Sequence, residues 1–364
     1  MGLAKIFPKL RVACLVAGAL GGGAGISAQV ESTAPVGKIF LFSGTVAQSL
    51  TRTERGPANL VTTYYQAEGV WPLARWVDVE FEVEGGQIVG NNHAESLSAS
   101  LGSAYRLNDL QEEPELFVPN FFLSGKQASG AFRWRLGRLG LQAAFDDNRV
   151  ARNKRTKFLA LPFTRNAAVP FPGKGLGAVA GWAPNPRAAL TGGVGDANAV
   201  STRNDLARLR GEWWTGGELT LRPLADPAAA ALRVLAWRTT RRNVPDDAWA
   251  VSADAALAPG TVAFVRLGNG SEHFARTHGL VAGGFAWENP FGRKTDFAGL
   301  AFSRGVAVAT GRRELLAEAV YRWQPVPWFA LSPDVQWIRH PALARTRGPD
   351  AWAFGLRCAF SQAR

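Results

Sequence analysis

The sequence predicts an all-β chain that forms a transmembrane antiparallel β-barrel, and three observations support this fold class. Apolar and polar residues alternate strictly in many segments of about ten residues, which is the period of a β-strand. Helical amphipathic patterns of similar quality are nearly absent. Short turns, expected on the periplasmic side, alternate with long polar loops, expected on the extracellular side, a layout typical of outer-membrane barrels and not of soluble sandwiches.

The first 28 residues have the form of a secretory signal peptide. Lys5, Lys9 and Arg11 precede an apolar run over 12–26, and the small residues Ser27 and Ala28 supply a cleavage site. The apolar run is short and rich in Gly for the ~20 residues of a transmembrane helix. We therefore expect residues 1–28 to be a signal peptide and residues 29–364 to form an outer-membrane barrel domain.

The segment WVDVEFEVE, residues 76–84, shows the alternation most clearly. Asp78, Glu80 and Glu82 fall on one face, whereas Val79 and Phe81 fall on the other. A soluble sandwich with its acids toward bulk water gives the same pattern, so this stretch alone does not decide. In a barrel the apolar face would meet lipid, and the acids would line a lumen whose water screens their charges.

The same alternation recurs along the chain. Strands are predicted at KIFLFSGTVAQ, LVTTYYQAE, GAFRWRLG, GGELTLRP, WAVSADAAL, LVAGGFAWE, ELLAEAVYRWQ, FALSPDVQWI and AWAFGLRCAF. Residues expected to contact lipid include Val79, Phe81, Tyr321, Val335 and Phe354. The candidate pore-lining residues on the polar faces are Asp78, Glu80, Glu82, Arg133, Arg135, Glu318 and Arg322. The three Arg residues can supply a basic wall opposite the acids.

Aromatic positions favour a membrane. Phe329 and Trp337 share a face eight residues apart, just after a turn and just before a loop. At about 3.3 Å per residue and a ~40° tilt they differ by roughly 20 Å in height, close to the ~25 Å apolar band that aromatic girdles flank. Trp352, Phe354 and Phe360 repeat this arrangement on the next predicted strand.

Composition argues against several other classes of protein. The formal net charge is +12 at pH 7, but the basic residues are scattered among aromatics without a basic tail, so no nucleic-acid partner is expected. Cys358 is the only Cys after the predicted signal peptide, which leaves no intrachain disulfide and no thiol cage for a metal. No catalytic residue, metal ligand or cofactor is predicted.

Several segments resemble the carbohydrate-selective outer-membrane porin family. They are ENPFGRKTDFAGLAFSRG, ELLAEAVYRWQPVPWFALSPDVQWIRHP and DAWAFGLRCAF, and the directly matching residues are Pro333, Asp334, Gln336, Ile338, Pro341, Gly355, Leu356 and Arg357. The chain departs from the family pattern at Trp337, Asn289 and Ala197, and in the residues 361–364 that extend beyond Phe360. The resemblance implies sixteen strands. It also implies that the loop after FRWRLGRLGLQAAFDDN folds inward, which would bring the cations of residues 145–175 opposite the acids of WVDVEFEVE.

The predicted function is passive, carbohydrate-selective diffusion of small sugars through a charged, water-filled lumen in the bacterial outer membrane. Outer-membrane lipid is an expected partner, and a homo-oligomer is possible. One alternative is that the lumen charges mainly pair and make the wall rigid. Another is a lipase-like or protease-like outer-membrane barrel hydrolase, which would need a Ser/His/Asp set built on one of His93, His273, His278 and His340. A soluble carbohydrate-binding sandwich is a more distant alternative.

Overall fold

The computed structural model describes most of the chain after the predicted signal peptide. It describes residues 37–51, 58–90, 96–110, 116–203, 211–270, 273–345 and 350–363. The predicted signal peptide, residues 1–28, lies outside the described residues, as does His93.

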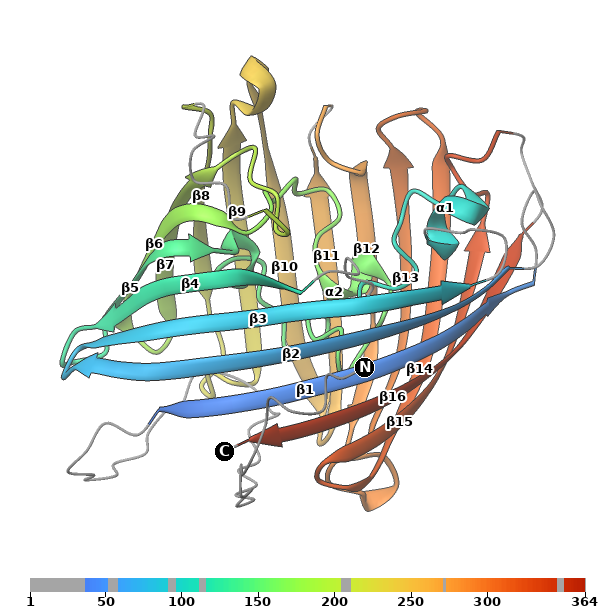
Figure 1. Cartoon of the computed structure of the whole chain (residues 1–364), viewed down its shortest axis with the longest axis horizontal. Coiled ribbons are helices and arrows are strands. Elements are labelled where there is room, and N and C mark those ends of the chain that lie inside the picture. Colours follow the sequence, from blue (N-terminus) through green and yellow to red (C-terminus); the bar gives the residue numbers. More distant parts are fainter. Residues whose placement is uncertain are drawn as a thin grey trace, which may run out of the picture.

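Sixteen antiparallel strands close into one barrel, in which each strand pairs with its neighbours in sequence and β1 pairs with β16 (Figure 1). This confirms the predicted fold class and the strand number. The strands are β1 (Lys38–Leu50), β2 (Ala58–Ala74), β3 (Val77–Gly90), β4 (Phe117–Lys126), β5 (Phe132–Leu139), β6 (Gly175–Asn185), β7 (Ala188–Asp196), β8 (Trp213–Leu221), β9 (Ala230–Thr239), β10 (Asp246–Ala258), β11 (Thr261–Asn269), β12 (Thr277–Glu288), β13 (Phe297–Ala307), β14 (Arg313–Val326), β15 (Phe329–Arg339) and β16 (Ala351–Ala363).

The connections differ at the two ends of the barrel. The turns after β2, β6, β10 and β14 contain two residues each, and we call this end the turn end. The loops after β3, β5, β7 and β15 are long, and all four leave the wall at the opposite end of the strands, here called the loop end. The predicted asymmetry of short turns and long loops is therefore confirmed.

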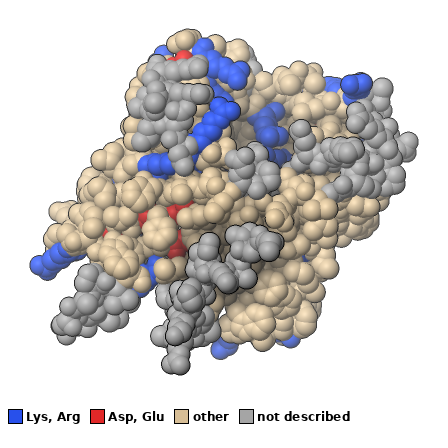
Figure 2. Space-filling view, viewed as in Figure 1, with Lys and Arg blue, Asp and Glu red and all other residues tan. Residues whose placement is uncertain are grey.

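The outward face of the wall is apolar. The pairing places Phe81 opposite Phe121 and Val335 opposite Phe354. Phe121 is 59% exposed and Phe354 is 49% exposed, so these rows face away from the barrel interior. In Figure 2 the wall is mostly tan, with a small group of Asp and Glu atoms within it and Lys and Arg mainly above it and toward the ends of the molecule.

Much of the barrel interior is filled by protein. The loop between β5 and β6, residues 140–174 and hereafter the inner loop, carries the short helix α2 (Leu161–Thr164) and the 3-10 helix η1 (Leu141–Ala143). Helix α1 (Leu97–Leu101) lies in the loop between β3 and β4, and two further 3-10 helices are η3 (Arg241–Asn243) and η4 (Pro290–Gly292). No described helix is both long and apolar enough to cross a membrane.

The largest hydrophobic core lies between these loops and the inside of the wall. Phe158 and Phe163 of the inner loop pack with Tyr105 from the loop after β3. Phe158 also contacts Phe264 on β11 and Phe297 on β13, with ring centroids 5.8 and 5.9 Å apart. The interior beside β10–β16 is thus packed like a protein core.

Candidate pore lining

The inner loop crosses the interior of the barrel, because its residues bond to strands on all sides. It contacts β2 and β3 through Arg155 and Lys174, and it contacts β14 and β16 through the backbone of residues 154–160. These bonds confirm the expectation, drawn from the family resemblance, that the loop after β5 folds inward.

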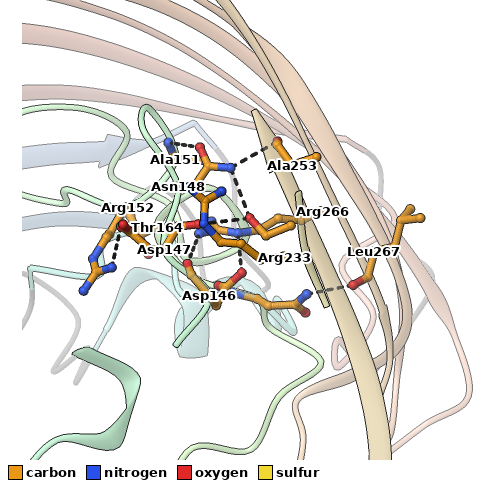
Figure 3. Close-up of polar contacts among 12 residues, drawn as sticks. Asp146, Asp147, Asn148, Ala151, Arg152, Thr164, Arg233, Ala253, Arg266 and Leu267 are labelled. Atoms are coloured by element: carbon orange, nitrogen blue, oxygen red, sulfur yellow. Dashed lines mark hydrogen bonds and ion pairs between the residues drawn. The ribbon is translucent and has the colours of Figure 1, made fainter. Parts of the chain in front are cut away.

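One anchor of the inner loop lies at Asp146, against β8 and β11 (Figure 3). Asp146 has a left-handed backbone with φ 53° and is fully enclosed. Its carboxylate accepts from Arg266 Nε at 3.1 Å and from the Asn166 backbone N–H at 2.7 Å, while its own N–H donates to Glu218 at 2.7 Å. The guanidinium of Arg266 is 0% exposed, so this ion pair is desolvated on both sides.

Two neighbours extend this anchor. The Asn148 amide donates to Ser252 Oγ at 3.1 Å and to the Ala253 carbonyl at 3.2 Å on β10. Arg152 forms an ion pair with Asp147 at 2.5 Å within the loop. The Asp146-Asp147-Asn148 sequence therefore fixes the start of the inner loop to the wall.

A second anchor lies on β14 and β16. Glu318 accepts from the backbone N–H groups of Leu159 at 2.6 Å and Ala160 at 2.8 Å. Arg357 donates to the carbonyls of Lys154 and Lys157, both at 2.7 Å. The Glu318 carboxylate accepts from two backbone N–H groups, and the Arg357 guanidinium donates to two backbone carbonyls. The wall therefore holds the inner loop through the loop's main-chain groups.

The loop after β3 supports the inner loop from the loop end. Asp109 accepts from Arg165 at 2.6 Å and from the Thr164 hydroxyl at 2.8 Å. Burial alone would raise the pKa of Asp109, but Arg165, together with Lys154 and Arg106, lowers that pKa below its ordinary value. Asp109 is therefore charged at neutral pH and ties the two loops together.

The opposite side of the inner loop meets the acids of β2 and β3. Lys174 lies 3.1 Å from Glu82 and 2.9 Å from Glu84, and Arg155 lies 2.9 Å from Glu68 and 3.8 Å from Glu82. These two cations keep about a quarter of their side-chain surface exposed, in contrast to Arg266. The predicted juxtaposition of loop cations with the acids of residues 76–84 is thus present in the structure.

A cavity of about 190 Å³ lies beside these charges. Its lining combines polar groups with the ring of Phe122 and with small residues of the inner loop, Ala143 and Ala144. The polar residues that line it are Glu68, Glu80, Glu82, Asn120 and Arg135. The space is bounded by β2–β6 on one side and by the inner loop on the other.

Four of the predicted pore-lining residues gather on this wall. Glu80, Glu82 and Arg135 line the same cavity, and the Arg135 guanidinium lies 5.5 Å from the centre of the Phe122 ring. By alternation Asp78 faces the same way as Glu80, two residues nearer the turn end. The side chain of Asp78 forms no hydrogen bond or ion pair with any described residue.

The predicted basic wall opposite the acids is wrong for Arg133 and Arg135. Both lie on β5, which only β4 separates from β3, so they are on the same side of the barrel as the acids. The cations that face the acids, Lys174 and Arg155, come instead from the inner loop. Arg133 is exposed near the turn end of β5.

The two predicted residues on β14 lie elsewhere. Glu318 is 1% exposed, and both of its oxygens are occupied by the inner loop, so it serves as an anchor. Arg322 donates to the Thr295 carbonyl at 2.9 Å and to Gln324 Oε1 at 2.6 Å. It borders a second, smaller cavity at the turn end, together with Phe42 and Arg155.

Several residues of the site were not among those predicted from the sequence. On β2, Tyr64 donates to Glu84 at 2.9 Å, and Gln66 bonds to both Glu68 and Glu82. On β4, Asn120 donates to Glu82. The polar residues Thr62, Tyr64, Gln66 and Glu68 alternate along β2, and this alternation could have identified Tyr64, Gln66 and Glu68 from the sequence.

None of the described histidines lines either cavity. His278 lies at the start of β12, and His340 follows β15 with φ 56°. No group of three His, Cys, Asp or Glu side chains in the described part of the chain could hold a metal ion.

Comparison with known proteins agrees with the geometry. Residues 201–361 match the model of the carbohydrate-selective porin family OprB, as the sequence resemblance predicted. A search of curated protein sequences found no match.

Solved porin structures share the fold at low sequence identity. The high-pH structure of Pseudomonas putida OprB aligns with a TM-score of 0.75 and 13% identity, covering 89% of this chain and 93% of that one. The structure of Pseudomonas aeruginosa OpdK with vanillate aligns with a TM-score of 0.52 and 10% identity, covering 90% of this chain and 99% of that one. An anion-selective porin from Comamonas acidovorans also aligns with a TM-score of 0.52 and 10% identity, covering 91% of this chain and 100% of that one. At these identities the likeness establishes a porin-type barrel.

Proposed function

We propose that this protein is an outer-membrane channel for the passive, carbohydrate-selective diffusion of small sugars. The family match over residues 201–361 and the porin-type barrel support this function. The apolar outward face of the strands supports placement in a membrane, and the porin neighbours favour the outer membrane of a bacterium.

The observation that carries the proposal is the arrangement of opposite charges, with partly exposed cations, beside the 190 Å³ cavity. Acids on β2 and β3 face Lys174 and Arg155 across the edge of this space, and Arg135 and Asn120 add donors. Sugar hydroxyls both donate and accept, so they exchange hydration for hydrogen bonds to both kinds of wall. The Phe122 ring offers an apolar surface to the C–H face of a sugar ring.

The solute path therefore runs along the β2–β6 wall, not through the centre of the barrel. The other side of the interior is closed by the hydrophobic core around Phe158 and by the anchors of the inner loop. Binding along such a path has to stay weak, because tight binding would slow release at the turn end.

Liposome swelling with a panel of sugars tests this function. Proteoliposomes should swell in small neutral sugars, and Ala143→Trp, which fills the cavity from the inner loop, should slow swelling several-fold. Ala225→Trp at an exposed turn is the control and should leave the rate unchanged. Equal rates for the two variants would contradict the path, and absence of sugar-dependent swelling in the parent would contradict the function. Ester and peptide hydrolysis by the same preparation would favour the hydrolase alternative instead.

A further inference from the structure

Three arginines on the outward face of the barrel have no role in the pore. Arg304 on β13, Arg313 on β14 and Arg339 on β15 are all exposed, and all lie near the loop end of their strands. None of them forms a hydrogen bond or ion pair through its side chain with another described residue. We call these three residues the outer arginine cluster.

The strand register places the three side chains close together. Arg304 and Arg339 are both paired with Leu315, from opposite sides. At the ~4.8 Å spacing of neighbouring strands their Cα atoms lie about 10 Å apart. Arg313 is two residues from Leu315 on the same strand, about 7 Å along it, and points to the same face. Three long side chains can therefore converge on one site.

On the same outward face, the next row of paired residues toward the turn end is mostly aromatic. Phe302, Ala317, Trp337 and Trp352 are paired in that order across β13–β16. Phe302 is 54% exposed and Trp352 is 45% exposed, and the rings of Trp337 and Trp352 lie 6.5 Å apart. Such a girdle marks the boundary between the hydrocarbon and the headgroups of a bilayer, so the arginines directly beyond it lie at headgroup height.

Local charge does not balance the cluster. Asp350, immediately before β16, continues the row of Arg304, Leu315 and Arg339, but it forms no ion pair with Arg339. Glu314 is adjacent in sequence to Arg313, but its carboxylate points inward and accepts from the Ala104 and Ala342 backbone. Three unpaired guanidinium groups on adjacent strands repel one another, which an anion bound between them would offset.

We propose that the outer arginine cluster binds the phosphate-bearing headgroup of an outer-leaflet lipid. Guanidinium groups bind phosphate oxygens through paired N–H donors, and three of them match a headgroup with more than one negative charge. The acyl chains of that lipid would lie against the aromatic row and in the notch above Ala317, between Phe302 and Trp337. This inference rests on the proposed placement of the barrel in an outer membrane, but it concerns a site outside the pore.

Native mass spectrometry of the mature protein in detergent, with added phosphatidic acid or phosphatidylcholine, tests the proposal. The parent should bind the first phosphatidic acid about tenfold or more tightly than phosphatidylcholine, because the three cations attract the anionic headgroup. The triple variant Arg304→Gln/Arg313→Gln/Arg339→Gln should lose this preference. The control variant Arg75→Gln/Arg187→Gln/Lys294→Gln removes the same charge from exposed positions at the turn end and should keep it.

Three results would overturn the proposal. They are an unchanged preference in the outer triple variant, an equal loss in the turn-end triple variant, and displacement of the lipid by inorganic phosphate at the same concentration, which would indicate a simple anion site. Circular dichroism and heat-resistant migration on gels verify that each variant is folded. Sugar swelling should be unaffected by the outer triple variant, so a failed swelling assay in the parent would reject the proposed function without deciding the lipid site.

Discussion

The two sides of the inner loop hold charges in different ways. On the side of β8–β16, Arg266 and Glu318 of the wall are buried and bond to the inner loop, and Arg266 does so through the buried Asp146. On the side of β2 and β3, Lys174 and Arg155 remain partly exposed and share their acids beside a cavity. The difference teaches that inward-facing charge alone does not identify a pore lining. In the proposed solute path, the lining differs from the anchors in that its cations, Lys174 and Arg155, are still reached by water.

The largest expected effect comes from the desolvated anchor. Arg266→Met leaves the Asp146 carboxylate buried without its cation, and removing one partner of a buried pair costs about 3–5 kcal/mol. We expect the inner loop to leave its place, which would lower the melting temperature, enlarge the channel conductance and expose the loop to protease.

Arg238→Met is the matched control for this anchor, since Arg238 is an exposed residue on the outward face of β9. It should change stability far less. Equal protease sensitivity of the two variants would show that Arg266 does not hold the loop.

A smaller effect is expected at the second anchor. Glu318→Gln keeps the shape of the side chain but removes the charge that two backbone N–H groups of the loop approach. Hydrogen bonds to charged groups contribute about 1.5–3 kcal/mol, so amide hydrogen exchange at Leu159 and Ala160 should become markedly faster. Glu80→Gln, on the cavity wall, should leave exchange at these amides unchanged, and faster exchange in both variants would contradict the division between anchor and lining.

The contact between the two loops should depend on pH only in acid. Because the pKa of Asp109 in the folded protein is lowered, the contact stabilises the loops above the ordinary pKa of Asp, about 3.9, and is lost as the pH falls through the lower folded value. Melting temperatures of the parent and of Asp109→Asn should therefore differ by a few degrees at pH 7 and converge in acid, once the pH is below the lowered pKa of Asp109. A difference that persists at low pH would show that the carboxylate charge is not what ties Asp109 to Arg165.

For the regular strands, the sequence correctly predicted which side chains point into the barrel and which point outward. In ELLAEAVYRWQ every second residue is buried inside, as the period predicts. The pattern fails where the strand itself is irregular. β4 carries Phe121 outside and Phe122 inside in succession, so its apolar residues do not alternate with polar ones, and it was not predicted. β7 is rich in Gly, which leaves little side-chain pattern to detect.

The roles of the inward acids could not be predicted in the same way. Glu82 and Glu318 look alike in sequence, because each is an acid in an alternating strand. Their difference depends on where residues 154–174 pass inside the barrel, and that path is set by contacts such as Glu318 with Leu159, 159 residues apart in the chain. The basic composition of the loop predicted that it would meet the acids, but not which acids it would cover.

The most direct test of the central claim is a single-channel measurement on Glu80→Gln/Glu82→Gln in planar bilayers, with and without glucose. Removing these two charges leaves Lys174, Arg155 and Arg135 in excess beside the cavity. The reversal potential in a salt gradient should shift toward anion selectivity, and glucose should block the ion current less strongly than in the parent. An unchanged reversal potential together with unchanged glucose block would show that these acids form only a hydrated wall and that the solute path lies elsewhere.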